Sequence, residues 1–84
     1  MTDQTRFPCA CCGYLTLTEP GPNTYEICPV CGWENDRLQQ EDPSLDVGAN
    51  PVTLEVARQT FARIGASTED LVGRLRAPRP EEQP

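Results

Sequence analysis

The sequence contains no histidine and no lysine, and residues that build a hydrophobic interior are scarce. Leucine, isoleucine, valine and phenylalanine together make up 16 of the 84 residues, beside a formal net charge of −6. Chains with so little apolar material and such a charge imbalance tend to stay disordered unless something else holds them. A domain of this length often needs disulfides, a metal or association with another chain.

The absence of histidine also limits the available chemistry. Histidine is the commonest general base, and it activates the nucleophilic cysteine of thiol hydrolases. The absence of lysine and the acidic balance disfavour binding to a phosphate backbone, which requires clustered basic side chains. We therefore expect no catalytic activity. Nucleic-acid binding is the last-ranked alternative, supported only by arginines in the C-terminal part.

Long apolar runs are absent as well. No stretch approaches the roughly 20 apolar residues that cross a bilayer, and no basic segment followed by an apolar one begins the sequence. We therefore expect a cytoplasmic protein without a membrane partner. In a reducing compartment, closely spaced cysteines more often bind metal than form disulfides, and five cysteines leave one thiol over in any fully paired scheme.

The five cysteines that are present lie in two short clusters. Four of them form two C-x-x-C pairs, each followed by glycine: Cys9, Cys12, Cys28 and Cys31. The two pairs have the separation of a four-cysteine zinc site. Two intervening residues let the chain turn back so that both sulfurs of a pair point at one centre. Gly13 and Gly32 permit the turn that follows, which favours this ligand set over one that includes Cys11.

Four thiolates in a tetrahedron suit zinc or iron. We predict zinc, with iron as the alternative. Because four protein ligands close the coordination sphere, no position remains for water or substrate, and hydrolytic metal catalysis is disfavoured.

Cys11 is the cysteine left over. The simpler interpretation is a small, partly buried thiol without a chemical role. The alternative is that Cys11 exchanges with Cys9 or Cys12 on the metal, or forms a disulfide that ejects the metal under oxidation. The protein would then be a thiol-based redox or zinc sensor.

Two segments between the pairs have the composition of strands. Residues 14–18 and 25–27 carry β-branched and aromatic side chains, and residues 19–24 are rich in turn formers. We expect these two segments to pair as a zinc-ribbon-like β-hairpin, within a metal-binding part at residues 7–34, whose open end brings the two cysteine knuckles together.

The region after the hairpin divides into a loop and a helical part. Residues 34–50 are acidic and predict a solvated loop, with Leu45 or Val47 against the core. Residues 51–76 are predicted to contain one or two helices. Four apolar residues recur there at steps of three and four, as on one helix face that packs against the hairpin: Leu54, Ala57, Phe61 and Ile64.

The limits of these helices follow from capping residues. Asn50 or Thr53 can cap the first helix, and Gly65 falls where a left-handed C-terminal cap would end it. A second, shorter helix is predicted from Ser67 or Thr68 to Arg76, weakened by a glycine inside it. The predicted architecture is a small metal-stabilised α+β fold: one domain at residues 7–77, between flexible tails at 1–6 and 78–84.

Three stretches also carry a resemblance to a known family. They are residues 7–14, residues 25–34, and the Gly-Ala-Asn run at 48–50 that precedes the predicted helix. In them the chain resembles the cysteine-rich CPCC family of small bacterial proteins. The family name comes from Cys-Pro-Cys-Cys, whereas Ala10 occupies the second position here. The resemblance implies a zinc-ribbon-like domain with a helical C-terminal part and no established activity. The cysteine turns also look like the knuckles of rubredoxin-type iron sites.

Taken together, the sequence predicts a structural zinc-binding module that contacts another protein and has no activity of its own. The knuckle residues Leu15, Val30 and Trp33 are candidates for the contact, although Trp33 is expected to fill the core. The alternatives are a rubredoxin-like iron protein that transfers electrons, a redox or zinc sensor that uses Cys11, and a nucleic-acid-binding zinc ribbon.

Overall fold

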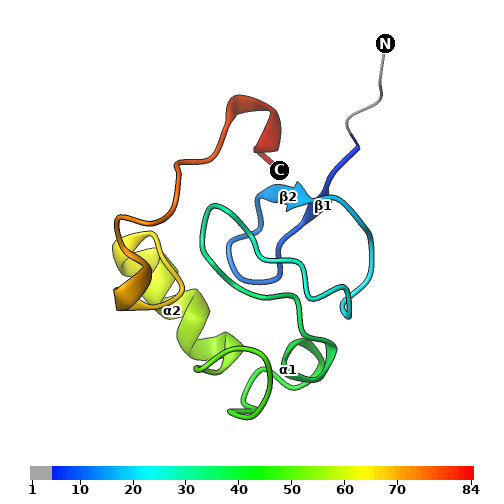
Figure 1. Cartoon of the computed structure of the whole chain (residues 1–84), viewed down its shortest axis with the longest axis vertical. Coiled ribbons are helices and arrows are strands. Elements are labelled where there is room, and N and C mark those ends of the chain that lie inside the picture. Colours follow the sequence, from blue (N-terminus) through cyan, green and yellow to red (C-terminus); the bar gives the residue numbers. More distant parts are fainter. Residues whose placement is uncertain (1–4) are drawn as a thin grey trace.

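Figure 1 shows the fold in a computed structural model that describes residues 5–84. The strands are β1 (Phe7–Pro8) and β2 (Leu15–Leu17), and the α-helices are α1 (Arg37–Glu41) and α2 (Leu54–Ile64). Two single turns of 3₁₀ helix follow, η1 (Glu69–Leu71) and η2 (Pro80–Glu82). The predicted small α+β fold, with a hairpin, a helix and four clustered cysteines, is confirmed.

The strands of the hairpin pair differently from the sequence prediction. β2 pairs antiparallel with β1, across the first cysteine pair, and not with residues 25–27. Residues 25–28 instead run beside residues 33–35, with Ile27 opposite Glu34. Each C-x-x-C turn therefore folds its own flanking segments together. The physical reason is that each turn is closed by hydrogen bonds, from the glycine N–H to the carbonyl of the first cysteine and from that cysteine's N–H to a carbonyl beyond the glycine, which set its two flanks antiparallel.

Helix α2 begins and ends where the sequence predicts. The Thr53 hydroxyl accepts a hydrogen bond from the Val56 N–H at 3.1 Å. Gly65 takes the left-handed conformation (φ 78°) and ends the helix. Leu54 and Ala57 are fully buried, and the ring of Phe61 meets Tyr14 edge-on with centroids 6.3 Å apart. The predicted apolar face thus packs against the first cysteine turn.

The predicted second helix is wrong beyond its first turn. Regular structure is limited there to η1, and Gly73 has a positive φ of 88°, which breaks the helical path. Ser67 is buried, and its N–H donates to the carbonyl of Cys31 at 2.8 Å. A tertiary contact with the second cysteine pair therefore outweighs the local helical preference.

The acidic stretch contains helix α1, which the sequence analysis missed. Asp36 caps the helix by accepting hydrogen bonds from the N–H groups of Leu38 and Gln39 at 2.9 and 3.3 Å. Leu45 is partly buried but does not pack against the core cluster, and Val47 is 70% exposed, so the expected core contact of this stretch is not formed by either residue. A helix this short, with Leu38 exposed, leaves no apolar period for a pattern to detect.

Buried amides order this stretch instead of apolar side chains. Gln39 is fully buried, and its amide nitrogen donates to the carbonyls of Leu45, Asn50 and Val52 at 3.4, 3.3 and 3.1 Å. Its amide oxygen accepts from the N–H and the side-chain amide of Asn50, both at 3.0 Å. The Asn50 side chain in turn bonds the N–H and the carbonyl of Glu34, each at 2.8 Å.

Part of the C-terminal segment predicted as a flexible tail, residues 78–84, contacts the rest of the fold. Turn η2 lies against β2, so the C-terminus returns to the start of the described chain (Figure 1). Glu82 is only 5% exposed there. The prediction for the N-terminal tail falls largely on residues 1–4, which lie outside the described range. Within that range, every helix is too short and too polar to traverse a membrane.

Candidate metal centre

The two cysteine turns bring four sulfur atoms together. The Sγ atoms of the four predicted ligands all lie within 4.8 Å of one another: Cys9, Cys12, Cys28 and Cys31. Two of these separations are 3.5 Å, between Cys9 and Cys31, and 3.7 Å, between Cys12 and Cys28. Zinc with Zn–S bonds of about 2.3 Å places its four sulfurs about 3.8 Å apart in a tetrahedron. The observed spacing therefore suits one four-coordinate ion.

Both cysteine turns use the same backbone geometry. Gly13 and Gly32 have φ values of 81° and 86°, and each N–H donates to the carbonyl of the first cysteine of its pair, at 2.9 and 2.8 Å. The Cys11 N–H donates to Cys9 Sγ and the Trp33 N–H donates to Cys31 Sγ, both at 3.4 Å. Such N–H donors spread the negative charge of a thiolate.

The site is closed on most sides. Cys28 and Cys31 have no exposed surface and Cys9 is 3% exposed, whereas Cys12 is partly exposed. Trp33 and Val30 are 1% and 2% exposed, so both belong to the core that surrounds the sulfurs. The expectation that Val30 is displayed for a partner is therefore wrong, and Trp33 fills the core as favoured.

The thiols strongly perturb one another. Hydrogen bonds from Cys12, and then from Cys31 and Cys9, hold the pKa of the Cys28 thiol well below its ordinary value. The same interaction with Cys28 raises the pKa of the Cys12 thiol, and interactions with Cys11 and Cys12 raise that of Cys31. Four sulfurs at this spacing cannot all be ionised unless a cation shares their charge. Metal binding would therefore release protons from the cluster.

Cys11 is not one of the four clustered ligands, although its side chain interacts with Cys31. Its side chain is 8% exposed, and its backbone N–H supports Cys9. A donor set of four thiolates with N–H support fits zinc, and fits iron equally well. Such a site can stabilise the fold or, with iron, carry one electron.

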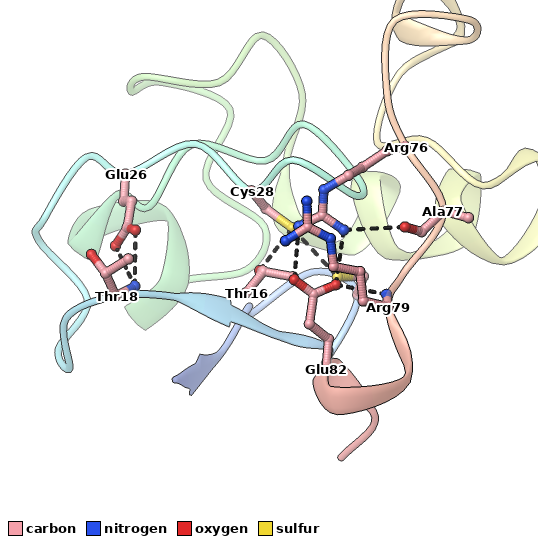
Figure 2. Close-up of polar contacts among 9 residues, drawn as sticks. Thr16, Thr18, Glu26, Cys28, Arg76, Ala77, Arg79 and Glu82 are labelled. Carbon is pink, nitrogen blue, oxygen red and sulfur yellow. Dashed lines mark hydrogen bonds and ion pairs between the residues drawn. The ribbon is translucent and has the colours of Figure 1, made fainter. Parts of the chain in front are cut away.

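A second layer of polar groups covers Cys28, and the sequence analysis missed it (Figure 2). The Thr16 hydroxyl lies 3.0 Å from Cys28 Sγ. Beside it, the Arg76 guanidinium donates to both carboxylate oxygens of Glu82 at 2.9 and 2.7 Å, and the Arg79 N–H donates to Glu82 at 2.8 Å. The Arg76 side chain, more than any other group, lowers the pKa of the Glu82 carboxyl to about 2. Both side chains of the ion pair are therefore charged at neutral pH.

Comparison with protein families identifies a match for most of the chain. The model of a family described as cysteine-rich CPCC matches residues 7–82, a span that contains both cysteine turns and extends through Glu82. No curated protein sequence matches the chain.

Proposed function

The chain belongs to the cysteine-rich CPCC family, and from the cluster of four cysteines we propose that it is a structural zinc-binding module that contacts another protein. The proximity of the four sulfurs carries this proposal. Structural zinc contributes about 10 to 16 kcal/mol in finger peptides, as much as the whole stability of a typical domain. A bound ion would therefore substitute for the apolar core that 16 large aliphatic and phenylalanine residues among 84 cannot build.

The metal content of protein purified from its own host tests the proposal. We expect one zinc ion per chain and a colourless solution. Iron with a red colour would instead support a rubredoxin-like electron carrier, because four thiolates with N–H donors at Cys9 and Cys31 can bind iron as well as zinc. Protein free of any transition metal would contradict both functions.

The contact with another protein is best placed on the arm that leads into the second cysteine pair. Tyr25 and Ile27 are 58% and 60% exposed and are separated by one residue. Tyr25 also has a positive φ of 58°, which is rare for an aromatic residue and costs free energy. Its N–H donates to the carbonyl of Asn35 at 2.9 Å, which holds this conformation. A strained, exposed aromatic side chain is a reasonable anchor for a partner.

Cross-linking in the host, followed by identification of the captured protein, tests this placement. The variant Tyr25→Ser/Ile27→Ser should lose the partner and keep its metal. The matched control is Val56→Ser/Val72→Ser, which removes two other exposed apolar residues and should keep both. Equal capture by both variants would place the contact elsewhere.

A further inference from the structure

The four sulfurs of the metal centre do not receive equal support. Among the described residues, backbone N–H donors are recorded for Cys9 and Cys31. For Cys28 the hydrogen-bond partner outside the cysteine cluster is a side chain, the Thr16 hydroxyl, which lies 3.0 Å from Sγ and donates when Cys28 is a thiolate. Thr16 is 7% exposed and lies on β2, so its hydroxyl is fixed by the sheet and shielded from water. Cys28 therefore depends on a residue from the other hairpin.

A positive charge lies on the same side of Cys28. The Arg76 guanidinium points at Glu82 (Figure 2). Arg76 and Glu82 line the same surface cavity as Thr16, the hydrogen-bond partner of Cys28. Four thiolates around a divalent ion carry a net charge of about −2, which a neighbouring guanidinium offsets.

Arg76 is held in this position at both ends. Its backbone N–H donates to the carbonyl of Pro29, inside the second cysteine turn, at 3.2 Å. Its guanidinium makes two hydrogen bonds with the Glu82 carboxylate, whose side chain is only 7% exposed. A bidentate contact of this kind restricts the orientation of the guanidinium as well as its distance from the carboxylate.

From these contacts we propose that Thr16 and Arg76 are positioning residues for the Cys28 thiolate, and that Glu82 fixes Arg76 so that the C-terminal segment controls metal release. The proposal rests on the metal-binding function above and adds the residues that regulate retention. When the hydroxyl or the guanidinium is removed, the Cys28 thiolate loses a hydrogen bond or a neighbouring positive charge, and the ion passes more readily to a competing chelator. Mutation of a residue that supports a metal ligand typically changes metal affinity by about 10- to 100-fold.

A spectroscopic test uses the protein with Co²⁺ in place of zinc. Loss of the hydroxyl in Thr16→Val raises the energy of the sulfur electrons, so the sulfur-to-cobalt charge-transfer band should move to longer wavelength. Thr16→Ser keeps the hydroxyl and should restore the band. The matched control is Thr18→Val, because Thr18 contacts Glu26 through its backbone N–H and is exposed.

A kinetic test follows zinc transfer from each variant to an excess of 4-(2-pyridylazo)resorcinol at pH 7. We expect release to be about tenfold faster in Thr16→Val and several-fold faster in Glu82→Gln. Glu81→Gln, which changes the exposed neighbour of Glu82, should release zinc at the wild-type rate. Should Thr16→Val fail to fold, Glu82→Gln carries the test alone, because Glu82 is not a ligand.

The outcomes separate this proposal from the function on which it rests. Wild-type protein that binds no zinc contradicts the metal-binding function itself. Wild-type protein that binds zinc, with unchanged release in Thr16→Val and Glu82→Gln, overturns the positioning role alone. Faster release in Thr16→Val without a shift of the cobalt band also overturns it, because the effect would then come from general destabilisation.

Discussion

The two cysteine turns have the same sequence pattern and the same backbone, yet their surroundings differ. In the first turn Cys12 is partly exposed, and a Cβ atom added to Gly13 would meet nothing within 4 Å. In the second turn both cysteines are fully buried, and a Cβ atom on Gly32 would run into the side chain of Leu71. The C-x-x-C-Gly pattern therefore determines the shape of a turn, and the rest of the chain determines its burial.

Distant segments cover the second turn much more fully than the first. The N–H groups of Ser67 and Arg76 donate to carbonyls inside the second turn, and the Trp33 indole donates to Gln40 in α1 at 3.0 Å. A comparable tether of the first turn comes from α2, where Arg58 Nε donates to the carbonyl of Ala10 at 2.9 Å. We infer that the metal exchanges ligands most readily on the side of the first turn, at Cys12.

The buried amides behind the second turn should produce the largest difference. Gln39→Leu leaves several buried carbonyls and the Asn50 N–H without partners, and should lower the free energy of unfolding by about 4 kcal/mol. Gln59→Leu is the matched control, because Gln59 is exposed on α2, and should change it little. Denaturant unfolding of the metal-bound proteins measures both. Equal stabilities would show that the amide network contributes nothing.

The two glycines give the most direct comparison of the turns. Alanine at either position is strained by the positive φ, which costs about 1 kcal/mol or slightly more. Gly32→Ala must also displace Leu71, so we expect a total loss of about 3 kcal/mol against about 1 for Gly13→Ala. Thermal unfolding monitored by circular dichroism gives both values. A larger loss for Gly13→Ala would reverse the comparison.

The tether of the first turn should have a smaller effect. Arg58→Met removes the hydrogen bond to Ala10 but keeps an apolar side chain, and should cost about 1 kcal/mol because the contact is exposed. Arg63→Met removes only an exposed ion pair with Glu69 at 3.5 Å, and should be close to neutral. Chemical denaturation with metal bound distinguishes the two. Indistinguishable stabilities would mean that α2 is held by its apolar face alone.

The smallest expected change is a gain in stability on the arm of the second turn. Asparagine tolerates a positive φ better than tyrosine, so Tyr25→Asn should raise the free energy of unfolding by about 0.5 kcal/mol. Ile27→Asn, at a position without positive φ, should bring no such gain. A destabilised Tyr25→Asn protein would show that the exposed ring contributes to the fold rather than to a partner contact.

Local patterns predicted the parts of this molecule that local chemistry determines. The spacing of the cysteines and glycines predicted four residues that the structure brings together, and the apolar period and capping residues predicted α2 with its ends at Thr53 and Gly65. Both depend on neighbours within a few residues along the chain.

The missed features depend on polar side chains that meet across long sequence separations. No periodic pattern in the sequence predicts that Gln39 is buried beside Asn50. None predicts the ion pair between Glu82 and Arg76 either, or the hydrogen bond between Thr16 and Cys28. The hairpin partners were predicted wrongly for a related reason. Composition identified the strand-like segments, but it did not show that each cysteine turn would pair its own flanks.

The most direct test of the account is removal of the metal from the intact protein. Trp33, the single tryptophan, is buried against the sulfur cluster and reports on it directly. After complete chelation we expect the Trp33 fluorescence to move to the red and the cooperative melting transition to disappear, and readdition of one equivalent of zinc should restore both. A metal-free protein with unchanged fluorescence and an unchanged melting curve would contradict the claim that the ion holds this fold together.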